Sequence, residues 1–318
     1  MPVTATVAVG LAVGLDAAFG EPPARLHPVA LLGRVVARIE REIEARETWL
    51  GMRPRLAGGL VAVVLPIGFA GAAVATVAGG TSVHPWLGAA LAGGVLFSTT
   101  SLRLLLGSAR TVVRESDTDL GAARNDLRAL AGRDASALDA PHVRSAAVES
   151  LAENLADGLV APLLAFATVA GVASALGLPS SVSLAAGAAA WVKAVNTLDS
   201  MLGYRSKPMG WAPARLDDAV MWAPARLSAL LLAVVAGAPA LPFRRRVRAF
   251  ARKPSSPNSG WPMATMAALL PARLHKPDTY DLDSDAPLPD VATATRAIRV
   301  TRRAGVLAFV LAGVVAWF

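Results

Sequence analysis

The strongest constraint on this sequence is a set of long apolar segments that carry almost no charge. A helix needs about 20 mostly apolar residues to cross the hydrocarbon layer of a bilayer. Only 17% of the 318 residues are charged, against about 25% in ordinary soluble domains. The sequence therefore predicts an all-α, polytopic membrane protein that forms a single integral membrane domain over residues 1–318. We expect spans near residues 3–19, 56–79, 86–106, 159–178, 183–198 and 304–318.

The charges between these segments predict their orientation. Twelve Lys and Arg residues lie within 242–303, whereas the short turns at 80–85 and 179–182 carry none. Because positive loops stay in the cytoplasm, we expect a multi-pass protein of the cell (inner or plasma) membrane with cytoplasmic long loops. Segment 227–241 has about 15 apolar residues, a length that suits a re-entrant or interfacial element. A full crossing there would leave the twelve positive charges outside, so we predict a re-entrant segment.

The composition excludes several classes of site and partner. The chain has no Cys, which excludes disulfides, thiolate metal sites and Cys nucleophiles. The net charge of +8 would suit nucleic acid in a soluble protein. Here Arg and Lys flank apolar segments, where they orient helices and attract anionic lipids. We therefore expect membrane lipids, and no nucleic acid, as partners.

Three charged side chains follow the first predicted span in a segment that contains three prolines. Prolines fix an irregular backbone, and a simple linker has no need of Glu21, Arg25 and His27 within seven residues. This pattern favours a binding role for all three side chains. The alternative is an interfacial cap in which Arg25 pairs with Glu21.

Three carboxylates precede the span predicted at 159–178. On a helix Glu149, Glu153 and Asp157 are spaced i, i+4 and i+8, so they share one face. Their repulsion must be offset by a divalent cation or by Arg side chains, and Mg²⁺ prefers such oxygen ligands. We expect these three residues to bind Mg²⁺, with Asn154 beside them. The alternative is a solvated acidic face without chemistry.

Polar side chains also lie within and after the span predicted at 183–198. Lys193 and Asn196 are costly inside a membrane and therefore indicate function. Lys193 could pair with Asp199 or with a carboxylate of segment 149–157. Cationic side chains that could hold a phosphate follow this span: Arg205, Lys207 and Arg215.

A fourth segment reads Pro-Ser-Ser-Pro-Asn-Ser-Gly-Trp-Pro-Met over residues 254–263. Its hydrogen-bond donors, held between prolines, suit an anion, and Asn258 and Ser259 are the candidates. No Walker A sequence occurs in the chain, so any nucleotide would be bound in another way.

These four segments resemble the CobD/CbiB family of cobalamin-biosynthesis proteins, the adenosylcobinamide-phosphate synthases. The resemblance lies in DAAFGEPPARLHPVALLGR, AAVESLAENLADGLVAPLLA, WVKAVNTLDSMLGYRS with GWAPARLDD, and SPNSGWPMATMAALL. These stretches occupy 16–34, 146–165, 191–218 and 256–270, in the family's order. The chain departs from the family after Leu270, where the usual Gly-rich stretch is replaced by PARLHKPDTYDL.

The resemblance implies an ATP- and Mg²⁺-dependent ligase that acts on a corrinoid. The family joins adenosylcobyric acid to aminopropanol phosphate, or to aminopropanol, through an amide bond. We expect Glu149, Glu153, Lys193 and Asp199 to act in catalysis. The expected substrate- and phosphate-binding residues are Glu21, Arg25, His27, Asn154, Asn196, Arg205, Lys207, Arg215, Asn258 and Ser259. Either a homo-oligomer or association with other cobalamin-pathway enzymes is compatible with the sequence.

Two other function classes stay open at this point. One is a Mg²⁺-dependent membrane transferase of the phospho-alcohol or prenyl type. Such enzymes usually place two or three residues between carboxylates, and Glu149, Glu153 and Asp157 have three between each pair. The other is a corrinoid-binding transporter or scaffold that consumes no ATP. Trp211, Trp222 and Trp261 could line a corrin groove, or they could anchor the protein at the membrane interface.

Overall fold

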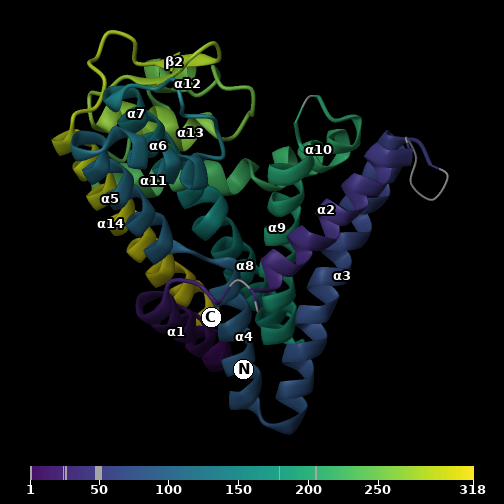
Figure 1. Cartoon of the computed structure of the whole chain (residues 1–318). Coiled ribbons are helices and arrows are strands. Elements are labelled where there is room, and N and C mark those ends of the chain that lie inside the picture. Colours follow the sequence, from purple (N-terminus) through teal and green to yellow (C-terminus); the bar gives the residue numbers. More distant parts are fainter. Residues whose placement is uncertain (1, 24, 26, 47–51, 179, 205) are drawn as a thin grey trace. The chain divides into compact units, whose positions relative to one another are not determined.

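The structure is a computed structural model that describes residues 2–23, 25, 27–46, 52–178, 180–204 and 206–318. It is almost entirely helical (Figure 1), which confirms the predicted all-α class. The chain divides into two compact units, and neither is continuous in sequence. The first comprises Met1–Ser101, Ala161–Met221 and Phe309–Phe318, and the second comprises Leu102–Val160 and Trp222–Ala308. The single membrane domain expected from the sequence stays a prediction, and the two units are described separately.

The first unit is built around one helix rich in small residues. Its elements are α1 (Pro2–Phe19), α2 (Pro28–Arg46), α3 (Pro54–Val83), α4 (Pro85–Thr99), α8 (Ala161–Ala175), α9 (Ser181–Leu202), a 3₁₀ turn η2 (Pro208–Gly210) and α10 (Trp211–Val220). Helix α9 packs against α2, α3, α4 and α8. A Cβ atom at Gly187 would lie 2.4 Å from the side chain of Val74 on α3. Small residues such as this glycine allow the close helix approach that membrane proteins use.

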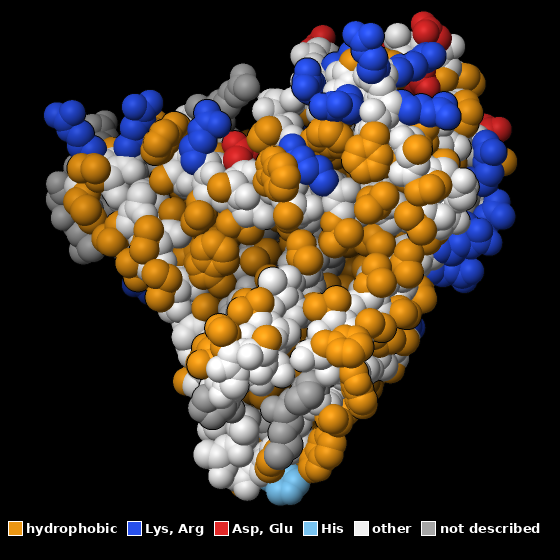
Figure 2. All heavy atoms as spheres, turned by 180° about the vertical axis from the view of Figure 1, so that it is seen from behind, with side chains coloured by type: hydrophobic (Ala, Val, Ile, Leu, Met, Phe, Trp, Pro, Cys, Tyr) orange, Lys and Arg blue, Asp and Glu red, His pale blue; other side chains and the backbone are white. Residues whose placement is uncertain are grey.

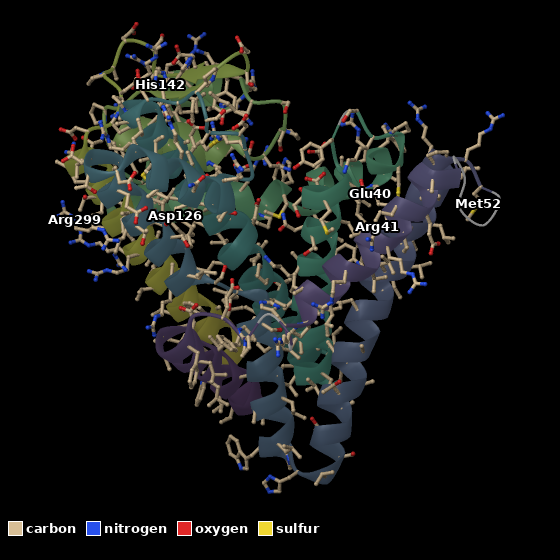
Figure 3. The ribbon with its side chains drawn as sticks, in the orientation of Figure 1. Glu40, Arg41, Met52, Asp126, His142 and Arg299 are labelled. Carbon is tan, nitrogen blue, oxygen red and sulfur yellow. The ribbon has the colours of Figure 1, made fainter. Side chains whose placement is uncertain are left out.

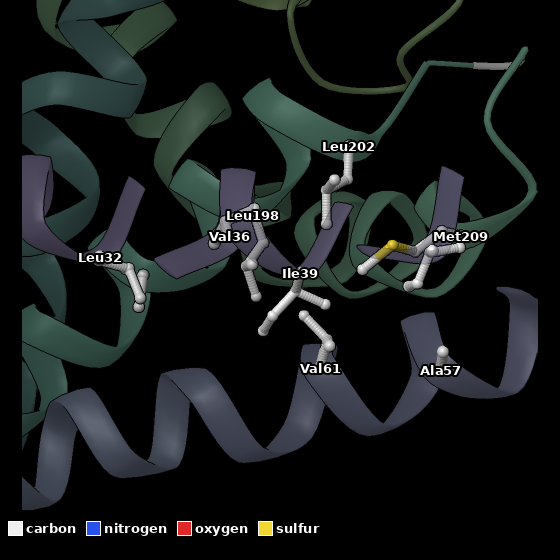
Figure 4. Packing of buried hydrophobic residues seen from close by; sticks show 10 residues of the cluster. Leu32, Val36, Ile39, Ala57, Val61, Leu198, Leu202 and Met209 are labelled. Atoms are coloured by element: carbon white, nitrogen blue, oxygen red, sulfur yellow. The ribbon is translucent and has the colours of Figure 1, made fainter. Parts of the chain in front are cut away.

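A hydrophobic cluster holds α2 across α3 and α9 (Figure 4). Leu32, Val36 and Ile39 recur at the spacing of one helix face, and all three are buried. They pack with Val61 of α3 and Leu198 of α9. The apolar face of α2 therefore determines how this helix docks.

The second unit is centred on α7 (Ala140–Leu155), which packs against α5 (Leu102–Thr118), α6 (Leu120–Ala131) and α13 (Gly260–Leu269). A π-helical turn, η1 (Ala156–Val160), continues α7 toward α8. The remaining elements are α11 (Trp222–Val235), η3 (Leu241–Phe243), α12 (Arg245–Phe250), β1 (Leu274–Lys276), β2 (Tyr280–Leu282) and α14 (Val291–Trp317), whose last residues belong to the first unit. The two short strands form an antiparallel hairpin in which His275 pairs with Asp281.

The number of candidate spans is smaller than expected. Within the described residues, four helices are long and apolar enough to cross a membrane, or five if α10 and α11 count as one interrupted span. The sequence predicts about six, and the spans predicted at 3–19 and 183–198 correspond to α1 and α9. Helix α1 is too short, and α9 is absent from the set, in keeping with its polar residues Lys193 and Asn196. The four candidate spans are Pro54–Val83 (α3), Pro85–Thr118 (α4 followed by α5), Ala140–Ala175 (α7, η1 and α8) and Val291–Trp317 (α14).

The outer face of α3 is apolar although it is exposed. Leu60, Val63, Val64 and Ile67 are each at least 40% exposed, and only 22% of the most apolar window of this helix is buried. On the face shown in Figure 2, exposed hydrophobic side chains form continuous patches, and Lys and Arg gather in separate groups. An uninterrupted apolar face on a long helix is compatible with contact with lipid.

Candidate functional site

A pocket in the first unit brings together three segments that are distant in sequence. The α1–α2 loop contributes Glu21 and His27, the end of α4 contributes Ser98 to Ser101, and α9 contributes Lys193 and Thr197. The loop begins at Gly20, whose φ of +79° is a conformation that glycine adopts without strain. The resulting cavity has a volume of about 380 Å³. We call it the first-unit pocket.

The first-unit pocket combines a carboxylate, an imidazole and an ammonium group. Burial raises the pKa of Glu21, and the positive charge of Lys193 and a hydrogen bond from Ser101 offset only part of this effect. Burial and Lys193 lower the pKa of His27. The Nδ1 atom of His27 accepts a hydrogen bond of 3.2 Å from the Val29 amide, which requires that nitrogen to be unprotonated. Both effects favour a neutral imidazole.

Sequence reasoning missed the four hydroxyl residues Ser98, Thr99, Thr100 and Ser101. The hydroxyl groups of the first three donate to backbone carbonyls of α4, at 2.8 to 2.9 Å. Their lone pairs therefore still have the capacity to accept hydrogen bonds from a ligand. The signal was present as a run of hydroxyl residues inside the segment predicted as a continuous span at 86–106. The helix breaks at this run, because Thr100 adopts an extended conformation.

Most of the other predicted residues of the first unit lie outside this pocket. Lys207 forms an ion pair with Glu40 of α2 and donates to the Met201 carbonyl at 3.2 Å. Arg215 is exposed and lies 3.3 Å from Asp218. Arg25 is exposed, and Asn196 and Asp199 are half-buried on α9. Arg205 lies outside the described residues.

In the second unit the carboxylate of Glu149 is held by three protein donors. Its side chain is 1% exposed. Arg133 donates at 2.7 Å and Tyr280 at 2.7 Å to Oε2, and Ser145 donates at 2.9 Å to Oε1. We call these four residues the Glu149 network. Ser145 in turn accepts a hydrogen bond of 2.8 Å from the His275 amide, which ties the hairpin to α7.

In the Glu149 network, the negative carboxylate favours a protonated Arg133 and a protonated Tyr280. Burial alone would lower the pKa of Arg133, but the charge of Glu149 and the hydrogen bond to it, together with the charges of Tyr280 and Glu153, raise it. Burial and Glu149 raise the pKa of Tyr280, so the phenol stays protonated and donates. Buried charges are tolerated when they are paired and hydrogen-bonded in this way. Nη1 of Arg133 and Nδ1 of His275 remain buried without a hydrogen-bond partner among the described residues.

The acidic residues of α7 do not form the predicted metal group. No three His, Asp or Glu side chains in the described part of the chain are placed to hold one metal ion. Two physical reasons account for this result. The first is that Arg133, Ser145 and Tyr280 donate hydrogen bonds to the carboxylate of Glu149. The second is the π-helical turn at Ala156–Val160, which has more residues per turn than an α-helix and therefore alters the i+4 spacing before Asp157. Glu153 and Asp157 are half-buried, and Asn154 donates to the Leu130 carbonyl at 3.5 Å.

The segment predicted to bind an anion, 254–263, contacts Arg226, which sequence reasoning did not single out. Nη1 of Arg226 donates to Oδ1 of Asn258 at 2.9 Å. The guanidinium lies 4.5 Å from the ring of Trp222 and 4.8 Å from the ring of Trp261, both within the range of a cation–π contact. Two of the three tryptophans considered for a corrin groove therefore enclose Arg226. Ser259 contributes its amide, which donates to Ser256 at 3.5 Å.

Comparison with known proteins assigns the chain to a family. The protein-family model described as "CobD/Cbib protein" matches residues 9–307 of this chain. The chain belongs to the CobD/CbiB family. This confirms the resemblance found in the sequence, and all four quoted motifs of the CobD/CbiB family lie inside the matched range.

Several relatives match over nearly their whole length. "Probable cobalamin biosynthesis protein CobD" of Methanothrix thermoacetophila is 34% identical over 95% of this chain and 93% of that protein. "Cobalamin biosynthesis protein CobD" of Rhodobacter capsulatus is 37% identical over 92% of each chain. The protein with the same name from Mycobacterium tuberculosis is 37% identical over 93% of this chain and 92% of that protein. No solved structure matches this member of the CobD/CbiB family.

Proposed function

We propose that this protein acts in cobalamin biosynthesis as an adenosylcobinamide-phosphate synthase. It would join a propionate carboxyl of adenosylcobyric acid to the amine of aminopropanol phosphate, or of aminopropanol, at the expense of ATP. The observation that carries the proposal is the first-unit pocket, in which Glu21, His27 and Lys193 converge. Relatives named cobalamin biosynthesis proteins that match over more than nine-tenths of the chain support it.

The reaction requires functions that the first-unit pocket offers. A carboxylate must be converted by ATP into a better electrophile before an amine can attack its carbon, and the attacking nitrogen must lose a proton. A neutral imidazole accepts such a proton near neutral pH, which is the role we propose for His27. The ammonium group of Lys193 would neutralise negative charge on phosphate or on the reacting carboxyl oxygen. Glu21 would orient the amine.

The residues do not support every part of the magnesium prediction. The carboxylate of Glu149 is buried and accepts hydrogen bonds from three protein donors, so we assign it a structural role and derive no step through a metal at that position. Mg²⁺ often needs one or two protein carboxylates when substrate phosphates supply the other ligands. Glu153 and Asp157 remain proposed ligands of this kind. Arg226, with Asn258, is a further candidate for holding an anionic substrate group.

We also propose the cell membrane as the location, with the long basic loops in the cytoplasm, where ATP is available. Four helices that are long and apolar enough to span support a membrane location. The concentration of Lys and Arg in 242–303 supports the orientation.

The proposal is tested by assaying the purified full-length protein with adenosylcobyric acid, aminopropanol phosphate, ATP and Mg²⁺. We expect an amide product by mass spectrometry, together with release of a nucleotide product. His27→Gln should lower kcat at least tenfold, whereas His84→Gln, at an exposed helix cap, should not. Corrinoid binding without product or nucleotide consumption would instead indicate the transporter or scaffold class.

A further inference from the structure

A groove in the second unit collects four arginines that the proposed reaction does not use. It is lined by Arg110 and Arg114 of α5 and by Arg299 and Arg302 of α14, and its volume is about 540 Å³. All four side chains are exposed, and Figure 3 shows Arg299 on the outer side of α14. We call this feature the arginine groove.

The arginine groove carries an excess of positive charge. Asp117 is the carboxylate that lines it, so four guanidinium groups face one acid. Among the described residues, no ion pair within 4.0 Å involves Arg110, Arg299 or Arg302, and Arg114 lies 3.6 Å from Glu115. Positive charges held this close repel one another. A bound anion would relieve the repulsion, and guanidinium groups match phosphate oxygens bidentately.

The floor of the same groove is apolar. Val113 is 3% exposed and Ile298 is 4% exposed, and both line the groove together with Val291. The ligand should therefore present hydrocarbon beside its charged group. A free phosphate would leave this part of the groove unused.

Both helices change from apolar to basic toward the same end. Helix α5 begins with Leu102, close to Gly305 of α14, since a Cβ at Gly305 would lie 2.6 Å from Leu102. From that point α5 runs past exposed Leu104 to Arg110, with one further exposed arginine, Arg103, in its first turn. Helix α14, followed backwards, runs from exposed Val306 to Arg303 and Arg302. The helices are thus antiparallel, and the exposed apolar part of each adjoins the arginine groove. A molecule with a phosphate head and acyl tails fits this sequence of surfaces.

We propose that the arginine groove binds the headgroup of an anionic phospholipid. The phosphate would lie between the α5 and α14 arginines, and the acyl chains would follow the apolar parts of these helices. The position of the arginine groove beside apolar helix segments agrees with membrane electrostatics. Basic residues next to an apolar helix end lie at the level of the lipid headgroups. The inference is independent of the reaction proposed above, since it uses none of the pocket residues.

The test measures lipid binding to full-length protein in neutral detergent, with fluorescent phosphatidylglycerol as the probe and phosphatidylcholine as the comparison lipid. The variant Arg299→Gln/Arg302→Gln should weaken phosphatidylglycerol binding about 25-fold, or about fivefold for each arginine. Arg110→Gln, on the other helix, should weaken it about fivefold. The matched control is Arg245→Gln/Arg248→Gln, which removes two exposed arginines from α12, and it should change binding less than twofold.

Four results would overturn the inference. The first is equal binding of phosphatidylglycerol and phosphatidylcholine by the unaltered protein. The second is an equal loss in the control variant, which would mean diffuse attraction by net charge. The third is competition by inorganic phosphate at concentrations similar to those of the lipid, which would mean a site for a free anion. Retained binding by Arg110→Gln would likewise exclude a site shared by α5 and α14.

Discussion

The phenol oxygen of Tyr280 lies 2.7 Å from Oε2 of Glu149 and donates a hydrogen bond to it across 131 residues of sequence. This bond connects the hairpin to the centre of α7, and it does so at a carboxylate that is almost fully buried. A carboxylate in that position needs every one of its donors, because an unsatisfied buried charge is costly. The stability of the second unit should therefore depend on Tyr280.

Replacing Tyr280 with Phe should lower the free energy of unfolding by about 1.5–3 kcal/mol, the range for a hydrogen bond to a charged group. The measurement is chemical unfolding of the purified protein in detergent. The control is Tyr204→Phe, because Tyr204 is 54% exposed, and surface changes usually stay within about 0.5 kcal/mol. Equal losses in the two variants would contradict the role of this hydrogen bond.

Replacing Glu149 with Gln should cost about 3–5 kcal/mol, because Arg133 would be left buried without its counter-charge. If the carboxylate of Glu149 stabilises the fold and does not bind a metal, the loss of unfolding free energy should be the same with Mg²⁺ present and after its removal with a chelator. Unfolding curves under both conditions measure this. A loss that disappears in the absence of Mg²⁺ would restore Glu149 as a metal ligand.

The lowered pKa of His27 predicts a stability that depends on pH. The unfolded chain binds a proton near pH 6.5, and the folded protein binds it only at a lower pH, so folding stability should fall as pH drops below 6.5. His27→Gln should reduce this fall, as measured by thermal midpoints at pH 5.5 and 7.5. His84→Gln is the control. The raised pKa of Glu21 acts in the opposite direction above pH 4.5, so the test needs the His27 variant and not the unaltered protein alone.

Two adjacent glycines of α3 should respond oppositely to Ala. A Cβ at Gly58 would lie 2.0 Å from the Met209 carbonyl oxygen, whereas one at Gly59 would meet nothing within 4 Å. Gly58→Ala should destabilise the first unit by about 1–3 kcal/mol through overpacking. Gly59→Ala should be neutral or stabilise by up to about 1 kcal/mol through helix propensity. Thermal unfolding compares them, and equal effects would refute the close approach of η2 to α3.

Changing Arg226 to Lys keeps the charge but removes the planar group between Trp222 and Trp261. We expect a loss of about 0.5–2 kcal/mol from the cation–π contacts and a change in tryptophan fluorescence. Arg248→Lys, at an exposed position on α12, should leave the fluorescence unchanged. An unaltered spectrum in Arg226→Lys would show that the tryptophans do not enclose the guanidinium.

Hydropathy predicted the helical class and most of the long helices, because apolar runs determine those elements locally. It also predicted a span at 183–198, where α9 carries Lys193 and is not among the helices that are long and apolar enough to cross. The spacing of Glu149 and Glu153 correctly indicated a helix. It could not reveal that Arg133, from the loop after α6, reaches Glu149, since that contact depends on tertiary packing. The need for a positive partner was nevertheless predictable from the repulsion between the carboxylates.

The segment after Leu270 is a second place where tertiary contacts could not be predicted from the sequence. Its departure from the family pattern gave no reason to expect a hairpin, yet Tyr280 and His275 both attach it to α7. The pocket was more accessible to sequence reasoning, because Glu21, His27 and Lys193 were all singled out by their unusual positions. The hydroxyl run from Ser98 to Ser101 was overlooked because it lies inside an otherwise apolar segment.

The discontinuity of both units has a consequence for synthesis of the chain. The second unit needs residues up to Ala308, and the first needs Phe309–Phe318, where the Gly313 carbonyl accepts a hydrogen bond from Thr6. Contacts of such long range form late, after the intervening loops have closed. Neither unit can be completed while the ribosome still holds the last helix, so α1 lacks its hydrogen-bond partner, 307 residues later in the sequence, until synthesis has ended. Chains that end early should therefore be removed by proteases and should not persist as half-folded fragments.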